Sequence, residues 1–107
     1  MFFNNAKYFA FVDDCRNAGI NIPIIPGLKP FSAKTQLSML PQVFHIDLPE
    51  ELVSAVTECK DTEAVRQVGV EWATKQAKEL IKRGVPAIHF YTMGRSDNVV
   101  KIARQAF

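Results

Sequence analysis

Two spacings of apolar residues occur along this chain, and each predicts a different kind of element. Apolar residues recur at intervals of three or four over most of the chain, which indicates amphipathic helices. Two short runs, residues 21–25 and 86–92, are apolar on both faces and predict strands that helices cover. The longest helical stripe, within residues 61–83, consists of Val65, Val68, Gly69, Trp72, Ala73, Ala77, Leu80 and Ile81.

Capping and breaking residues divide the remaining helical pattern into four shorter helices. The first contains residues 8–15 and the second residues 32–41, where Pro41 should end the hydrogen-bond ladder. The third opens at residues 48–51, because a proline followed by two carboxylates suits the first turn of a helix. The last begins at residue 96 or 97 and ends near the C-terminus.

The order of these elements indicates an α/β fold. A strand end at residues 1–3 is followed by helix, strand, three helices, strand and helix, and this alternation implies parallel strands joined by helical crossovers. Only two full strands and the end of a third are predicted, so long sheet edges would stay unpaired. We therefore expect residues 1–107 to be the last part of a larger α/β domain, incomplete on its own.

Composition and charge narrow the class of protein. Of the 107 residues, 48% are hydrophobic and 22% are charged, as expected for one soluble globular domain with a core. The net charge of +2 is small and the basic residues are scattered, so we expect no nucleic-acid partner. No apolar run approaches the roughly 18 residues of a membrane span, and no secretory signal is visible. We expect a cytoplasmic protein in which Cys15 and Cys59 are free thiols.

The first candidate site lies at the carboxyl end of the second predicted strand. His89, Tyr91 and Met93 share one face of that strand, because side chains alternate between faces. Ligands of parallel α/β sheets bind beyond the carboxyl ends of the strands, where Arg95 could hold a carboxylate or a phosphate. The alternative is structural: Tyr91, Met93 and a hydrogen-bonded His89 would belong to the core, and Arg95 would be solvated.

The second candidate site lies in residues 24–36. Gly27 at a strand end would let backbone approach a ligand closely, and the Gln36 amide could face a heterocycle. Lys29 could bind an anion or be a solvated lysine, and Gln36 could equally be an exposed helix residue. The chain has no dinucleotide fingerprint, phosphate loop, nucleophile elbow or metal-ligand cluster. The residues alone therefore predict a ligand-contacting half-site, with no catalytic residue and no metal.

Five segments occur in an order and spacing that point to a family. They are IIPGLKPFS at 24–32, the glutamine at 36, LPEEL at 48–52, VGVEWA at 68–73 and GVPAIHFYTMGRSD at 84–97. Together they resemble methylenetetrahydrofolate reductase over essentially the whole chain. The resemblance implies a (β/α)8 TIM barrel that binds FAD. It also implies that NADH or NADPH reduces 5,10-methylenetetrahydrofolate to 5-methyltetrahydrofolate, which feeds methionine synthesis.

The resemblance also places the chain within that barrel, from the end of strand 6 to helix 8. Residues 1–3 would end the sixth strand, residues 21–25 would form the seventh and residues 86–92 the eighth. Gly94 departs from the family, which often has asparagine there. The implied contacts with the folate and nicotinamide substrates are Gln36, Leu40, Tyr91, Met93 and Arg95.

The same resemblance implies what the chain lacks. The family's acidic residue that assists protonation of the folate, and most FAD-binding residues, belong to earlier strands. We therefore expect the isolated chain to be inactive and free of flavin. Its open barrel edges should make it self-associate or form a homo-oligomer. Two alternatives remain: a non-catalytic half-barrel that acts as an interaction module, and another barrel protein that uses Arg95 for an anionic ligand. No motif distinguishes NADH from NADPH.

Overall fold

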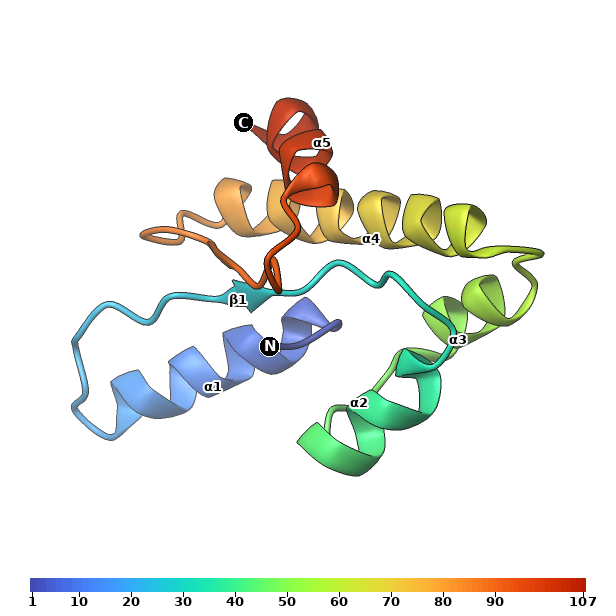
Figure 1. Cartoon of the computed structure of the whole chain (residues 1–107). Coiled ribbons are helices and arrows are strands. Elements are labelled where there is room, and N and C mark those ends of the chain that lie inside the picture. Colours follow the sequence, from blue (N-terminus) through green and yellow to red (C-terminus); the bar gives the residue numbers. More distant parts are fainter.

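Five helices and one pair of parallel strands make up the fold (Figure 1). The computed structural model describes all of residues 1–107. β1 and β2 pair in parallel, with Gly27 opposite His89, so the predicted α/β class with helical crossovers is confirmed. In chain order the elements are α1 (Asn5–Asn17), β1 (Gly27–Leu28), α2 (Gln36–Phe44), α3 (Glu50–Thr57), α4 (Thr62–Lys82), β2 (His89–Phe90) and α5 (Asp97–Ala106).

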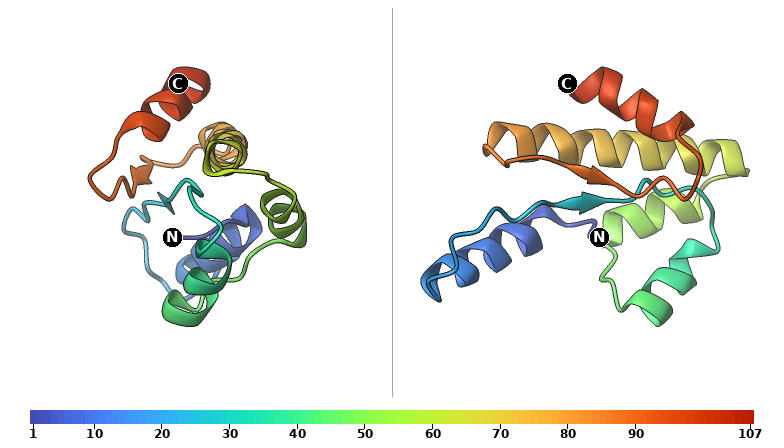
Figure 2. Two further views of the ribbon diagram at one scale, coloured as in Figure 1. Left: turned by 45° about the vertical axis from the view of Figure 1, so that its right-hand side comes forward. Right: turned by 60° about the vertical axis from the view of Figure 1, so that its left-hand side comes forward.

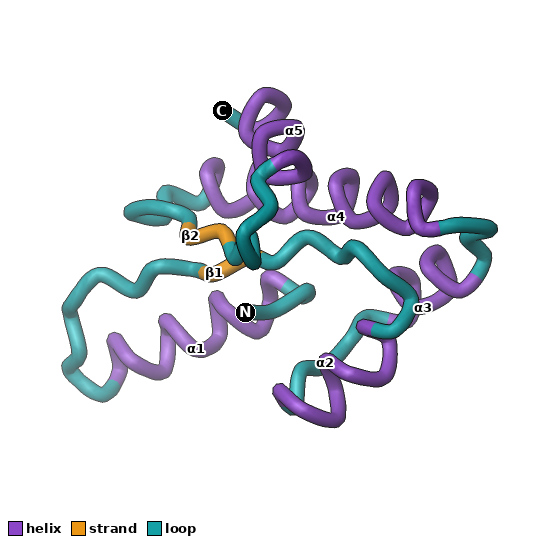
Figure 3. The backbone as a smooth tube through the Cα atoms, viewed as in Figure 1, coloured by secondary structure: helices purple, strands orange, loops and turns teal.

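The helices lie on both sides of the paired strands (Figures 1 and 2). α4 lies along one side of the strands, and α5 lies on the outer side of α4, while α1 lies on the opposite side of the strands. α2 and α3 form a corner beside the end of α4 at which that helix begins. Figure 3 shows that loops, not strands, make up most of the path from α1 to α2.

Capping residues determine where the helices begin. The side chains of Asn4 and Asp61 cap α1 and α4 by accepting hydrogen bonds from backbone amides at 3.0 and 2.8 Å. α3 begins directly after Pro49 and has two glutamates in its first turn, where the helix dipole favours carboxylates. The predicted opening of α3 and the predicted long helix are therefore confirmed.

The first strand is displaced from its predicted position. Residues 21–25 form no strand, so that prediction is wrong, and β1 follows at Gly27–Leu28. Proline explains the short ladder, because Pro26 and Pro30 on either side of β1 have no amide hydrogen to donate.

The second strand is confirmed only in its centre. Of the predicted residues 86–92, two form β2, and the His89 and Tyr91 amides each donate a hydrogen bond of 2.9 Å to the carbonyls of the β1 segment. Ile88 and Phe90 pack against the core, as the alternation of side chains predicts. His89 and Tyr91 therefore face away from that core.

α2 differs from the prediction at both ends. It begins at Gln36 instead of Ser32, and it continues through Pro41 to Phe44. A proline inside a helix removes its own amide bond but leaves later turns intact, and the His45 amide donates to the Pro41 carbonyl at 3.1 Å. His45 then ends the helix in a left-handed conformation, with φ of 53°.

Two hydrophobic clusters meet along α4. The first consists of Tyr8, Leu28, Val70, Ala73, Ala77, Leu80 and Ile102, and the second of Phe3, Phe31, Leu40, Leu52, Val56 and Val65. Leu28 and Phe31 are only three residues apart but belong to different clusters, so the segment between them crosses α4. Gly69 permits this crossing, because a Cβ atom there would collide with the Phe31 carbonyl oxygen.

Side chains of α4 hold the first residues of the chain. The Trp72 indole donates to the Phe3 carbonyl at 2.9 Å, and the Gln76 amide donates to the Phe2 carbonyl at 3.3 Å. Gln76 also donates to Asn5 Oδ1 at 3.0 Å, and the Asn5 amide donates to the Gln76 carbonyl at 3.1 Å. The predicted strand end at the start of the chain is therefore wrong, since these residues bond to a helix and form no strand.

Much apolar surface is uncovered. Only 21 of 107 residues are buried, and the radius of gyration of 14.2 Å exceeds the roughly 13 Å of a compact domain of this size. No helix is both long enough and apolar enough to cross a membrane. The exposed large apolar side chains include Phe11, Ile22, Ile25, Val43 and Phe44.

The crossing at Gly69 predicts a large cost for adding one methyl group. In Gly69→Ala, the new Cβ atom would meet the Phe31 backbone, which cannot rotate away as a side chain could. We expect the free energy of unfolding to fall by about 2–3 kcal/mol, although alanine favours a helix over glycine by about 1 kcal/mol. Thermal unfolding followed by circular dichroism measures the change. Lys78→Ala, at an exposed position of α4, is the control and should change stability by less than about 0.5 kcal/mol. An unchanged midpoint in Gly69→Ala would contradict the close crossing.

Candidate functional site

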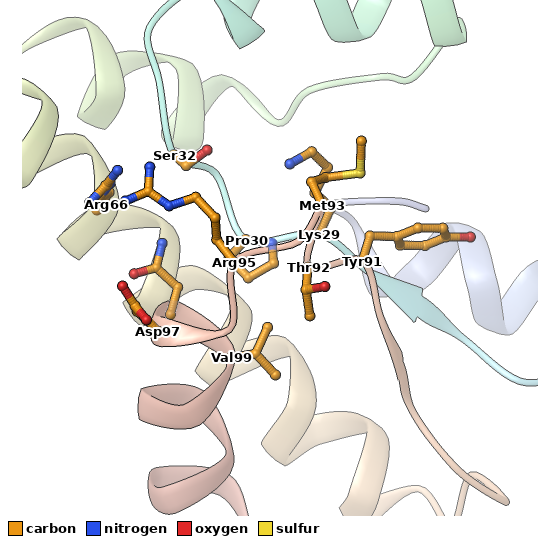
Figure 4. Close-up of a pocket in the computed structure, with 11 residues that line it drawn as sticks. Lys29, Pro30, Ser32, Arg66, Tyr91, Thr92, Met93, Arg95, Asp97 and Val99 are labelled. Atoms are coloured by element: carbon orange, nitrogen blue, oxygen red, sulfur yellow. The ribbon is translucent and has the colours of Figure 1, made fainter.

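A cavity lies just beyond the carboxyl ends of the two strands (Figure 4). Its volume is about 110 Å³, and the segments that follow β1 and β2 both contribute to its wall, together with α4 and the start of α5. In a sheet of parallel strands, this is the place where a ligand is expected. The residues that bear on its chemistry are Lys29, Ser32, Arg66, Tyr91, Met93, Arg95 and Asp97.

A tight turn brings Arg95 to this cavity. The Arg95 amide donates to the Thr92 carbonyl at 3.0 Å, and the two central residues, Met93 and Gly94, have φ angles of 52° and 82°. Positive φ at both central positions is the pattern of a type I′ turn, which glycine accepts without strain and methionine does not. Met93 therefore lies in a turn, not on the strand face predicted to include it, and its side chain is 75% exposed.

Tyr91 is positioned by Gly27. A Cβ atom at Gly27 would lie 2.7 Å from Tyr91 Cε2, so the ring covers the backbone of the neighbouring strand directly. The His89 ring meets the Tyr91 ring edge to face, with centroids 4.7 Å apart and planes at 72°. The predicted open space at Gly27 is therefore occupied by an aromatic side chain, which presents its own surface to a ligand in place of the backbone.

The cavity is rich in positive charge. Lys29, Arg66 and Arg95 line it, whereas Asp97 is its one carboxylate. None of the three cations forms an ion pair, since the chain's one ion pair joins Lys7 and Asp47. Burial lowers the pKa of the Lys29 ammonium below its ordinary value, because the charged form loses solvation. In Figure 4, Arg95 extends toward Arg66 and Ser32, and the Tyr91 ring points to the opposite side.

Of the five predicted site residues, Tyr91, Met93 and Arg95 come together at this cavity, and Gln36 and Leu40 do not line it. Gln36 is buried, and its Oε1 accepts hydrogen bonds from the Ser32 amide at 2.8 Å and the Ala33 amide at 3.4 Å. It therefore fixes the loop that carries Ser32 to the cavity.

Leu40 has no exposed surface and belongs to the second cluster with Phe31. Its predicted contact with a substrate stays a prediction, and the side chain would have to leave this cluster to make it. Arg66 also lines the cavity but was not predicted from the sequence. It lies about one helical turn before Gly69, and the close crossing at Gly69 is what brings this part of α4 beside the strand ends. No group of three or more His, Cys, Asp or Glu side chains is placed to hold a metal ion.

Comparison with known proteins identifies the same family along the chain. The family described as methylenetetrahydrofolate reductase matches residues 1–106. Methylenetetrahydrofolate reductase (NADH) 1 of Arabidopsis thaliana is 32% identical over 103 residues, which cover 95% of this chain and 17% of that protein. Methylenetetrahydrofolate reductase 1 of Schizosaccharomyces pombe is 36% identical over 94 residues, covering 87% of this chain and 16% of that protein. The 5,10-methylenetetrahydrofolate reductase of Escherichia coli K12 is 32% identical over 97 residues, covering 90% of this chain and 33% of that protein. The chain thus spans a sixth to a third of the length of these relatives.

The packing of Tyr91 on Gly27 predicts a change that affects the site more than the fold. In Gly27→Ala, the new methyl group would displace the Tyr91 ring, which can turn away at a cost of about 1 kcal/mol. We expect the nuclear Overhauser contacts between the His89 and Tyr91 rings to disappear, while the unfolding midpoint falls only slightly. Tyr91→Phe keeps the ring and is the control, so its contacts with His89 should persist. Unchanged ring contacts in Gly27→Ala would show that Gly27 does not position Tyr91.

Proposed function

This chain belongs to the methylenetetrahydrofolate reductase family, and on that premise we propose that it contributes one wall of the substrate site of an oxidoreductase. The reaction would be the reduction of 5,10-methylenetetrahydrofolate to 5-methyltetrahydrofolate, with NADH or NADPH as the reductant. The names of its relatives specify NADH in Arabidopsis thaliana and NADPH in Caenorhabditis elegans. The observation that carries the proposal is the cavity beyond the two strand ends, where Tyr91, Met93 and Arg95 meet.

We assign each of these side chains a part in binding. The Arg95 guanidinium would hold a carboxylate of the folate by paired hydrogen bonds, which its planar shape favours. The Tyr91 ring and the Met93 side chain would form an apolar wall beside the ring systems of the two substrates. Gln36 would present its remaining amide donor, and Leu40 would support this wall from behind or reach the substrate after movement of its cluster.

We propose that residues 1–107 form the C-terminal portion of a single (β/α)8 barrel domain, in which β1 and β2 would be parts of strands 7 and 8 and α5 would be helix 8. Three features support this placement: the strands are parallel, helices connect them, and the cavity lies at their carboxyl ends. The face with His89 and Tyr91 would point into the barrel. In that arrangement the free edge of β2 would pair with the first strand of the barrel.

FAD, which the family resemblance implies, would supply hydride-transfer chemistry to the complete protein. The residues of this chain do not fit it, because the cavity of about 110 Å³ is smaller than the roughly 300–1,000 Å³ of a typical cofactor pocket. A second cavity of about 550 Å³ lies between α1, α3 and α4. Three glutamates and one lysine line it, and this excess of negative charge would repel the flavin's pyrophosphate; they are Glu50, Glu51, Glu79 and Lys75. We therefore propose that other parts of the complete protein hold FAD and that the isolated chain is inactive.

The uncovered apolar surface favours a second function, as an interaction module that associates with itself or with another part of a barrel. Phe11, Ile22, Val43 and Phe44 are each more than half exposed, and the outer edges of both strands are unpaired. Homo-oligomerisation through these edges is compatible with either function. We further propose a cytoplasmic location, in which the free thiols of Cys15 and Cys59 would stay reduced.

A chimeric enzyme tests the proposed function. This chain would replace the matched segment of the Escherichia coli relative, so that the strands and cofactor site of that enzyme complete the barrel. We expect the chimera to bind flavin and to reduce 5,10-methylenetetrahydrofolate. Arg95→Ala should raise the KM for the folate by about tenfold to a hundredfold, with kcat and flavin absorbance within about twofold, because a binding contact is lost.

Lys101→Ala, an exposed change on α5, is the control for the chimera and should leave both constants unchanged. A folded, flavin-containing chimera without reductase activity would contradict the proposed function. Equal losses of folate and flavin binding in Arg95→Ala would contradict the part assigned to that residue. A soluble, defined dimer of the isolated chain, together with an inactive chimera, would favour the interaction module.

A further inference from the structure

We infer that the larger cavity, between α1, α3 and α4, binds a small aliphatic diamine, which is an alkyl chain with an ammonium group at each end. This cavity shares no lining residue with the one in Figure 4, so the site would stand without the proposed function. Its volume of about 550 Å³ lies within the range of sites that bind small molecules. The hydrogen bonds and charges of its wall indicate which kind of molecule it would take.

The hydrogen bonds between α1 and α4 use all the side-chain amide donors of Asn5 and Gln76. Gln76 Nε2 donates to the Phe2 carbonyl at 3.3 Å and to Asn5 Oδ1 at 3.0 Å. Asn5 Nδ2 donates to the Gln76 carbonyl at 3.1 Å and to Glu79 Oε1 at 2.8 Å. The orientation of both amides is fixed, because a backbone carbonyl can only accept. Neither amide therefore has a donor left for the cavity.

One acceptor on this wall has no partner. Gln76 lines the cavity and is only 7% exposed, yet its Oε1 accepts no hydrogen bond from the chain. This oxygen is not enclosed in the core, since Thr74 Oγ1 is the one fully enclosed side-chain atom without a partner. Gln76 Oε1 therefore reaches the surface of the cavity, where a molecule in the cavity can supply its donor. The two bonds of Gln76 Nε2 hold it in place.

Carboxylates on two sides of the cavity add to this acceptor. Glu50 and Glu51 come from the start of α3, and Glu79 comes from α4. None of them forms an ion pair with Lys75, the one cation of the wall, because the chain's one ion pair lies elsewhere. Three negative charges and one positive charge leave a surplus of two negative charges. The positive end of the α3 dipole offsets only about half a charge.

An aromatic side chain completes the wall. The Trp72 indole donates to the Phe3 carbonyl at 2.9 Å, which fixes the ring and uses its N–H. The side-chain donors that remain free on the wall belong to Asn4 and Lys75, which are both exposed. An ammonium group donates three hydrogen bonds and accepts none, and a tryptophan ring attracts it. Two ammonium groups on one alkyl chain match the surplus of two negative charges and the carboxylates on two sides.

The experiment is a titration of the ¹⁵N-labelled 107-residue chain with 1,4-diaminobutane, and separately with butylamine, at constant ionic strength. We expect saturable shifts of the amide resonances of residues 3–6, 49–51 and 72–79, and of the Gln76 side-chain amide. Residues 93–97, at the other cavity, should not shift. Butylamine has the same alkyl chain with a single charge, so it should bind at least about threefold more weakly.

Matched variants distinguish this site from attraction by surface charge alone. Glu79→Gln keeps an oxygen that can accept from Asn5, and it should weaken diamine binding by about threefold. Glu51→Gln should have a similar effect. Lys75→Gln removes a repulsion and should tighten binding by about twofold, which damage to the fold could not do. Glu71→Gln removes an equal charge from the same helix outside the cavity, and it should change binding by less than about 1.5-fold.

Absence of saturable shifts around the cavity would overturn the diamine site, as would equal weakening by Glu79→Gln and Glu71→Gln. Butylamine binding as tight as that of the diamine would overturn the match to two charges. If Glu79→Gln does not fold, Glu51→Gln and Lys75→Gln still decide the matter. Saturable binding by a chain whose chimera is inactive would leave this site standing without the reductase. An active chimera that binds no diamine would remove the site and leave the reductase.

Discussion

The contact between Gly69 and the backbone of Phe31 is the constraint on which the rest of the structure depends. It lets the segment after β1 cross α4 at van der Waals distance, so that Leu28 enters one hydrophobic cluster and Phe31 the other. Through this crossing, Phe31 joins the cluster that contains Leu40 of α2 and Leu52 of α3, so both helices are packed against the segment that follows β1. The same contact holds Lys29 and Ser32 at the mouth of the cavity. Core packing and site geometry are therefore set by one position that accepts no side chain.

Hydrogen bonds from α4 also fix the position of the first residues of the chain. The carbonyls of Phe2 and Phe3 accept bonds from the Gln76 and Trp72 side chains, and Asn5 exchanges bonds with Gln76. Each such bond contributes only about 1 kcal/mol on balance, but an unpaired buried amide would cost more. The network thus specifies where α1 begins more than it adds stability. α4 is in this way the common support of both clusters, of the first residues and of the cavity.

The helices were predictable because their signals are local. The apolar stripe predicted α4 to within one residue at each end, since it depends only on residues a few positions apart. The strands were less predictable because proline limits their pairing: Pro26 and Pro30 leave β1 only two residues long. The parts of the site that were missed depend on contacts between distant segments. Neither the filling of the space over Gly27 by Tyr91 nor the approach of Arg66 has any signature in the spacing of residues.

The turn from Thr92 to Arg95 determines both the shape of the cavity and the position of its charges. Two successive residues with positive φ reverse the chain at once, so that α5 begins beside the strand ends instead of beyond them. The helix start adds the positive end of its dipole to the three cations of the cavity, and Asp97 in its first turn offsets part of that field. Asp97 therefore stabilises α5 in the absence of a ligand and weakens the attraction for an anion. The cavity therefore has more positive charge than Asp97 offsets, and the turn that sets its shape also sets this charge, because it brings Arg95 and the start of α5 to the same wall.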